Sequence, residues 1–163
     1  MNIVVDIQYG EEIAEGVDVE GLATYVLTQE EQPETTEVSI TLVSNEEIHE
    51  LNKEYRGIDR VTDVLSFECD GFDDDFDEGG VYEDADIPED EPFLLGDIVI
   101  APDVCIDQTA IYGTTPAQEF QVLLVHGLLH LCGWDHVHSD EEAEEMEARE
   151  RELLAGWGLP NIR

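Results

Sequence analysis

The sequence predicts a single α+β domain in which a small mixed β-sheet is surrounded by helices. Three observations indicate this class. The chain has 163 residues, which suits one domain with a core of its own. Segments with strand-like alternation and segments with helical periodicity both occur along the chain. No internal repeat or linker divides the sequence, so we treat residues 1–163 as one domain.

Four short segments have the composition and pattern of β-strands. The clearest is 37–43 (EVSITLV), where apolar residues alternate with polar ones and predict a half-buried strand. The apolar face of this segment consists of Val38, Ile40 and Leu42. The other three segments are 2–8 (NIVVDIQ), 63–68 (DVLSFE) and 95–100 (LGDIVI). Together they make up the predicted sheet.

The first three predicted helices are short. Residues 18–31 carry apolar side chains at helical spacing. Ser44 or Asn45 is expected to cap a second helix that runs to about Tyr55. A third helix is expected over 102–111, where a proline occupies the first position.

Two longer helices are predicted near the C-terminus. Thr115 is expected to cap the main helix, which runs to about Cys132 and ends at Gly133, a residue suited to a left-handed C-cap. Ser139 is expected to begin the last helix, and Glu142 completes a capping box three residues later.

The charge of the chain is extreme. Asp and Glu number 42 against 6 Lys and Arg, which gives a formal charge of -36. Self-repulsion of this size opposes the compact state in dilute salt. In about 1 M salt the Debye length falls to about 3 Å and most of the repulsion vanishes. Because the acids lie on every predicted surface, we interpret them as an adaptation to a salt-rich, halophilic cytoplasm. A mimic of nucleic acid is the alternative.

Cysteine usage and the N-terminus both indicate a compartment. Cys69, Cys105 and Cys132 are odd in number and lack a CxxC spacing, which favours free thiols in a reducing environment. The start, MNIVVDIQYG, has no basic segment followed by a long apolar one, so no signal peptide is expected. The longest nearly apolar run, 122–134, is too short to span a bilayer. We therefore expect a cytoplasmic protein that does not enter a membrane.

Residues 70–92 are expected to be an acidic loop insertion. The segment holds 12 acids in 23 residues, together with several glycines and prolines. Asp73, Asp75 and Asp77 superficially resemble a calcium-binding EF-hand loop. Such a loop needs glycine at its sixth position, where this chain has Glu78. Solvated surface is therefore the preferred interpretation.

Three histidines lie in the most apolar part of the chain, HGLLHLCGWDH. His126 and His130 are four residues apart on the predicted main helix, so both can reach one metal ion. Gly133 lets the chain turn back, and His136 can then supply a third nitrogen. Three protein ligands leave a fourth position for water, which is the catalytic arrangement of zinc. A single histidine would be read as a core or surface residue, but three in eleven residues indicate a metal site at the end of a central helix.

The remaining candidates near this motif have simpler interpretations. His49 and His138 are expected at the surface, and Cys132 is expected in the core because it points away from the metal-binding face. The spacing resembles that of metzincin peptidases, which place a glutamate directly after the first histidine as general base. Here that position is Gly127, and the nearest helical acid, Glu119, lies seven residues before His126. Peptide hydrolysis by that mechanism is therefore unsupported.

A second group of candidates is basic. Lys53, Arg56 and Arg60 are three of the six basic residues of the chain. They can bind phosphate, or they can pair with helix acids such as Glu50 and Glu54, which is worth under about 1 kcal/mol. We favour the phosphate role for Arg56, because its planar guanidinium at the helix end suits phosphate oxygens. The two interpretations stay open for the other two residues.

Three segments together resemble one family: LNKEYRGIDRVTDVLSF, LGDIVI and HGLLHLCGWDH. The set is similar to the YbeY family of metal-dependent endoribonucleases, over roughly residues 37–155. The resemblance implies an α+β fold, one zinc ion held by His126, His130 and His136 with a water, and a catalytic or RNA-contacting role for Arg56. Two departures are Val61, where the family commonly has proline, and the long acidic loop.

The resemblance also implies a substrate and partners. These are single-stranded RNA, and specifically the 3′ end of small-subunit ribosomal RNA, with a role in ribosome quality control on the small ribosomal subunit. DNA and membranes are not expected partners. The metal would polarise a phosphate oxygen or lower the pKa of its bound water toward about 7, and Arg56 would stabilise the developing charge.

Several side chains near these motifs have two interpretations each. Asp135 can orient a histidine or stabilise a turn. Tyr55 and Trp134 can stack on bases or pack in the fold. Two other function classes also stay open. One is a metallopeptidase-like hydrolase, and the other is a non-catalytic, zinc-stabilised module that binds the ribosome.

Overall fold

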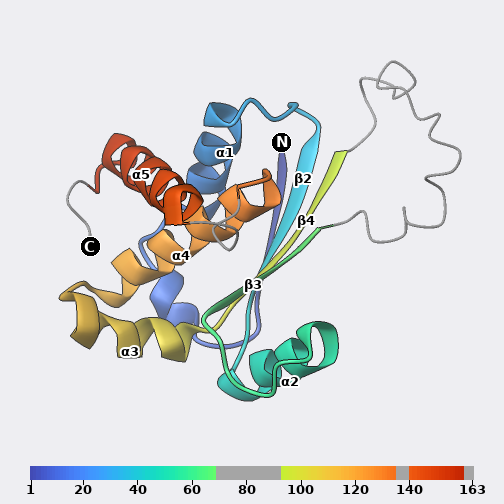
Figure 1. Cartoon of the computed structure of the whole chain (residues 1–163), viewed down its shortest axis with the longest axis vertical. Helices are drawn as coiled ribbons and strands as arrows, with labels where there is room; N and C mark the ends of the chain where they lie inside the picture. Colours follow the sequence, from blue (N-terminus) through green and yellow to red (C-terminus); the bar gives the residue numbers. More distant parts are fainter. Residues whose placement is uncertain (69–92, 135–139, 160–163) are drawn as a thin grey trace, which may run out of the picture.

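The four predicted strands form one mixed sheet in the order β1-β2-β4-β3 (Figure 1). The computed structural model describes residues 1–68, 93–134 and 140–159. Within these ranges β1, β2 and β4 run parallel, and β3 is antiparallel to β4. Among the described strands β3 pairs with β4 alone, so it is an edge strand of this sheet. The strands are β1 (Asn2–Ile7), β2 (Thr36–Leu42), β3 (Val64–Glu68) and β4 (Phe93–Ile100).

The predicted helices are also present, with bounds close to those expected. They are α1 (Val19–Gln29), α2 (Asn45–Arg56), α3 (Pro102–Tyr112), α4 (Pro116–Leu131) and α5 (Asp140–Trp157). A short 3-10 helix, η1 (Glu11–Ala14), was not predicted, since a single turn has no periodicity to detect.

Side-chain caps fix where several helices begin. Asp18 and Ser44 accept hydrogen bonds from backbone groups in the first turns of α1 and α2. Thr115 and Gln118 form a complete capping box at the start of α4. These local bonds explain why the helix starts could be predicted from the sequence. The predicted cap at Ser139 lies outside the described residues.

The two faces of the sheet are covered differently. The alternating residues of β2, Val38, Ile40 and Leu42, are buried in the main core together with Ile98 and Ile100 of β4. This face carries α1, α4 and α5 (Figure 1). Since side chains alternate along a strand, the neighbours of these residues point the other way.

Helix α2 packs against the opposite face. Its Ile48 lies in a second apolar cluster with Leu65 of β3 and Val99 of β4. Figure 1 shows α2 on the other side of the sheet from α4. The sheet therefore separates the helix that carries Arg56 from the helix that carries the first two candidate metal ligands.

Helix α4 is the centre of the fold and contacts α1, α3, α5, β3 and β4. From Glu119 to Leu131 it is buried at every position except Gln121, His126 and His130. The predicted single α+β domain with a small mixed sheet is confirmed. The predicted 70–92 loop and His136 lie outside the described residues. Among the helices that the structure describes, none is both long and apolar enough to cross a membrane.

Candidate functional site

His126 and His130 lie together on α4 and are two of the three partly exposed residues in its buried stretch, 119–131. Their ring centroids are 4.7 Å apart and the rings meet nearly edge to face. This is the contact that the four-residue spacing predicted. The described residues contain no group of three His, Cys, Asp or Glu side chains placed to hold a metal ion. The third predicted ligand, His136, falls in the segment between the described ranges.

A buried glutamate of α5 contacts the first histidine. The Nδ1 atom of His126 lies 2.7 Å from Oε2 of Glu150, and Glu150 is 8% exposed. Glu150 was not among the site residues predicted from the sequence. A signal existed, because Glu150 recurs at helical spacing with the buried residues Met146, Leu153 and Leu154, which places an acid on the apolar face of α5.

A pocket opens beside this contact. It has a volume of about 280 Å³ and is walled by helices α3, α4 and α5. Tyr112, His126, Glu150 and Arg151 are among its lining residues. The contact between His126 and Glu150 is therefore reachable from the pocket, although Glu150 itself is buried.

Gly127 explains how closely α4 approaches the sheet. A Cβ atom at this position would lie 3.1 Å from Cγ2 of Ile98 and 3.2 Å from Oγ of Ser66. Ser66 also donates a 3.3 Å hydrogen bond to the backbone oxygen of Gly127. A glutamate here would point into β3 and β4 rather than toward the histidines, so the position cannot supply the general base of a metzincin peptidase.

Glu119 is also unsuited to act as a base at the histidine pair. Its side chain is fully buried, and its Oε2 accepts a 2.6 Å hydrogen bond from the hydroxyl of Thr114. Glu119 therefore fastens the start of α4 to the turn before it.

The basic residues divide into two groups by their contacts. Arg149 and Arg151 of α5 pair with acids, at 2.7 Å to Glu30 and 3.9 Å to Glu147. In the part of the chain that the structure describes, no ion pair forms at the exposed trio Lys53, Arg56 and Arg60. The sequence left open that the trio pairs with Glu50 or Glu54. The described residues show no such ion pair.

Arg56 does not touch the histidines. It is the last residue of α2, which packs on the sheet face opposite to α4. Tyr55, next to it, is 63% exposed, and its ring lies 5.4 Å from that of Phe67 on β3. The end of α2 is thus anchored at the edge strand, whose Ser66 faces α4 on the other side.

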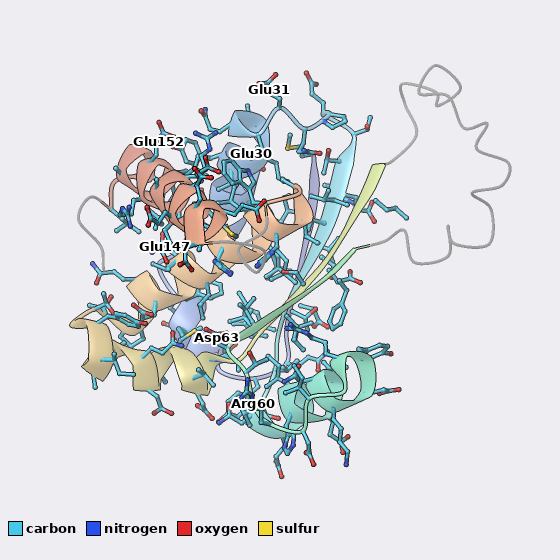
Figure 2. The ribbon with its side chains drawn as sticks, viewed as in Figure 1. Glu30, Glu31, Arg60, Asp63, Glu147 and Glu152 are labelled. Carbon is cyan, nitrogen blue, oxygen red and sulfur yellow. The ribbon has the colours of Figure 1, made fainter. Side chains whose placement is uncertain are left out.

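The turn after α2 is held by polar contacts. Nδ2 of Asn52 donates a 2.9 Å hydrogen bond to the backbone oxygen of Arg60, and Nε2 of His49 lies 2.5 Å from Oδ1 of Asp59. The hydrogen bond from His49, aided by the charge of Lys53, lowers the pKa of Asp59. Asp63 accepts a hydrogen bond from Gln108 of α3. Figure 2 labels Arg60 and Asp63 in this turn, between α2 and β3.

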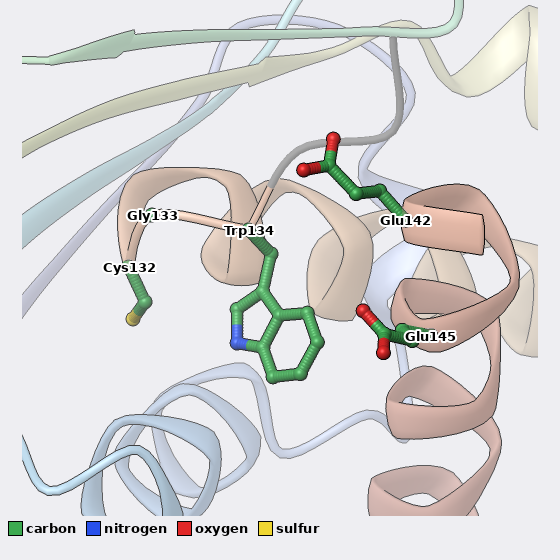
Figure 3. Close-up of a pocket in the computed structure, with 5 residues that line it drawn as sticks. All are labelled: Cys132, Gly133, Trp134, Glu142 and Glu145. Carbon is green, nitrogen blue, oxygen red and sulfur yellow. The ribbon is translucent and has the colours of Figure 1, made fainter. Parts of the chain in front are cut away.

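The end of α4 is a packing site rather than a stacking platform. Trp134 packs against the main core, and its Nε1 donates a 2.7 Å hydrogen bond to Glu30. Trp134 and Cys132 line a second pocket of about 260 Å³ together with Gly133, Glu142 and Glu145 (Figure 3). Burial, and secondly the charge of Glu30, raises the pKa of Cys132 to about 12. Cys132 is therefore a neutral thiol packed against the core, as predicted.

Comparisons with known proteins agree with the sequence motifs. Residues 8–158 match the family model described as Endoribonuclease YbeY. Relatives with that name include one from Chloroflexus aurantiacus, 41% identical over 161 residues, with 98% of this chain and 99% of the relative covered. A Bacillus subtilis relative is 41% identical over 142 residues, which cover 87% of this chain and 85% of the relative.

A solved structure is similar as well. The solution structure of a Thermotoga maritima protein superposes with a TM-score of 0.54 at 26% sequence identity, over 95% of this chain and 91% of that one. The family match spans every described element except β1, which ends one residue before the match begins. The chain belongs to the YbeY endoribonuclease family.

Proposed function

We propose that this protein is a zinc-dependent endoribonuclease that cuts single-stranded RNA. The observation that carries the proposal is the pair His126 and His130, whose ring centroids lie 4.7 Å apart on α4 in a chain of this family. His136, which follows the end of α4 in sequence, is proposed as the third ligand. This last assignment rests on the motif and the family resemblance.

The donor set fits a zinc ion chemically. Imidazole nitrogens are ordinary zinc ligands, and three of them leave a position for water. A ligating histidine also usually gives its other ring N–H to a carboxylate. Nδ1 of His126 lies 2.7 Å from the Glu150 carboxylate, which suits this arrangement. When bound, zinc would supply Lewis-acid polarisation of a phosphate oxygen and a bound water of lowered pKa.

The residues of the chain would bind and orient the RNA. Arg56, exposed and unpaired among the described residues, has the planar donor set that phosphate oxygens prefer. Because Arg56 and the histidines lie on opposite faces next to the edge strand β3, we propose that the RNA backbone crosses this edge. Tyr55 offers an exposed ring beside Arg56 on which a base can stack.

The identity of the RNA is a further part of the proposal. We propose the 3′ end of small-subunit ribosomal RNA as the substrate, the small ribosomal subunit as the partner, and the cytoplasm as the location. A role in ribosome quality control belongs to the same proposal. These assignments come from the family resemblance. The charge of -36 implies that activity needs high salt, where repulsion between the acids and RNA is screened.

A peptidase function is less well supported than RNA cleavage. Gly127 occupies the position of the metzincin base, and Ile98 and Ser66 leave no space there for a longer side chain. Casein-type substrates should therefore stay intact under conditions in which RNA is cut. The third class, a non-catalytic zinc-stabilised module, predicts no turnover on any substrate.

The first test is metal content after purification in high salt. About one zinc per chain is expected in the wild type, and the bound zinc should be lost in His130→Ala. His49→Ala is the matched control, because it removes an imidazole far from α4 and should leave the zinc content unchanged. A well-folded wild type without zinc would refute the metal-dependent proposal.

The second test is RNA cleavage by the same proteins and by Arg56→Ala. To contact the reacting phosphate, Arg56 would have to reach around the edge strand β3, and loss of such a contact costs about 10²–10³-fold in rate. Arg56→Ala should show that loss while its circular dichroism is unchanged. Chelation should abolish cleavage but leave the fold intact, because both core clusters consist of apolar residues and include neither His126 nor His130. If the protein unfolds on chelation and never cuts RNA, the non-catalytic module is correct.

A further inference from the structure

We propose that Glu150 is the positioning residue for His126: it fixes the tautomer and the orientation of the imidazole that presents Nε2 to the metal. The inference rests on the proposed function, since it assigns His126 as a metal ligand. It adds a residue from a different helix, α5, 24 residues after His126 along the chain.

The contact is short and shielded from solvent. Oε2 of Glu150 lies 2.7 Å from Nδ1 of His126, and the two side chains are 11% and 26% exposed, respectively. Glu150 sits among the buried apolar residues Met146, Leu153 and Leu154 of α5. A carboxylate in such a place is costly unless it has a hydrogen-bonding partner. His126 is the hydrogen-bonding partner that the structure shows for it.

The direction of the hydrogen bond determines which nitrogen faces a metal. An ionised carboxylate only accepts hydrogen bonds, so Nδ1 of His126 is the donor. In a neutral imidazole the lone pair then belongs to Nε2. Metal-ligating histidines are commonly held in this way, and loss of the carboxylate partner typically weakens metal binding by about 10–100-fold.

The neighbouring residue Glu147 provides a matched control. It lines the same pocket of about 280 Å³ and lies one turn earlier on α5. Its side chain is 66% exposed and lies 3.9 Å from Arg151 rather than on His126. Glu147→Ala and Glu150→Ala therefore remove the same charge from the same helix, and only the second removes the contact with the imidazole.

The pocket also permits a rescue experiment. Truncation of Glu150 to alanine leaves a space for a carboxylate next to Nδ1, and the pocket connects that space to solvent. Formate should enter and restore the hydrogen bond. Glu150→Gln keeps the size of the side chain and an oxygen acceptor, so it should preserve the tautomer and most of the metal affinity.

The test combines two measurements on the full chain in high salt. The first is the ¹⁵N spectrum of the histidine rings in metal-free protein at mildly alkaline pH, with His126 assigned by its loss in His126→Asn. We expect a protonated Nδ1 in the wild type, Glu147→Ala and Glu150→Gln, and a mixture of tautomers in Glu150→Ala. The second is zinc affinity by competition with a chelating dye.

The affinity of Glu150→Ala should fall by about 10–100-fold relative to Glu147→Ala, and formate should recover part of the loss. The inference is overturned if His126 carries its proton on Nε2 in the wild type, or if Glu150→Ala keeps its tautomer. It is also overturned if the zinc affinity of Glu150→Ala lies within twofold of Glu147→Ala. Should Glu150→Ala fail to fold, Glu150→Gln carries the same test. A proton on Nε2 of the His126 ring in that variant would contradict the inference.

Failure of the proposed function would look different. A wild type that binds zinc with the expected dependence on Glu150 but cuts no RNA would refute the nuclease and leave the positioning role in place. A wild type that binds no zinc would refute the metal-dependent proposal, and a metal-free spectrum with the proton on Nε2 would overturn the positioning role as well.

Discussion

Ser66 donates its hydroxyl to the backbone oxygen of Gly127 over 3.3 Å, so the edge strand β3 meets helix α4 one residue from His126. This contact brings a helix that is buried on almost every side to the edge of the sheet. The candidate metal ligands therefore lie beside an edge strand, and the end of α2, with Arg56, lies against the other face of that strand.

The approach of α4 to the sheet makes Gly127 a sensitive position. Gly127→Val should destabilise the protein by about 1–3 kcal/mol, because its side chain would have to displace Ile98 or Ser66. Gly127→Ala should cost less, since the gain in helix propensity of about 1 kcal/mol offsets part of the crowding. Urea unfolding in high salt measures both. In a Ser66→Ala background, Gly127→Ala should destabilise the protein less, because the crowding atom Oγ is gone. If alanine and valine at position 127 lower the free energy of unfolding equally, α4 does not pack this closely on the sheet.

Glu30, directly after α1, links the segment that follows α4 to helix α5 through two hydrogen bonds. Its carboxylate accepts from Nε1 of Trp134 and from Nε of Arg149, both at 2.7 Å, and its side chain is 10% exposed. Glu30→Ala should lower the free energy of unfolding by about 3–5 kcal/mol, because it leaves Arg149 partly buried without this partner. Thermal unfolding followed by tryptophan fluorescence provides the measurement. Glu31→Ala, on the adjacent exposed residue, is the control, and equal effects of the two variants would contradict the assignment.

The pair His49 and Asp59 should appear in the acid titration. The hydrogen bond from His49 lowers the folded-state pKa of Asp59 below its ordinary value of 3.8. The contribution of Asp59 to stability is therefore present above that value and is lost as the pH falls through the lowered folded-state pKa. A carboxyl NMR titration should show a midpoint below the ordinary value, and His49→Ala should raise it. A midpoint that does not move in His49→Ala would mean that the pair does not form in solution.

The trio of Lys53, Arg56 and Arg60 should account for the salt dependence of RNA binding. Each phosphate contact adds about 0.7 to the slope of log affinity against log salt for single strands, so each alanine substitution should reduce the slope by about that amount. Arg149→Ala is the control, because it removes the same charge from a residue that already pairs with Glu30 and Glu152. A slope that falls equally in Arg149→Ala would indicate a general charge effect and no contact with RNA.

Much of the fold follows from local signals. The alternation of Val38, Ile40 and Leu42 predicted β2, and Thr115 as a capping residue predicted the start of α4. Such patterns work because strand faces and helix caps depend on residues within a few positions of each other. The contact between His126 and His130 was predictable for the same reason, since residues four apart on a helix are neighbours.

The tertiary structure decided what depends on distant packing. It placed Glu150, 24 residues along the chain, against His126, and it put Arg56 on the opposite side of the sheet from the histidines. It also paired Arg149 with Glu30 and left Lys53, Arg56 and Arg60 without an ion pair among the described residues. The sequence determined the periodicity of each element and the histidine spacing, because backbone geometry alone sets them. Which side chains meet across elements was decided by how α4 and α5 pack on the sheet, and no local pattern records that packing.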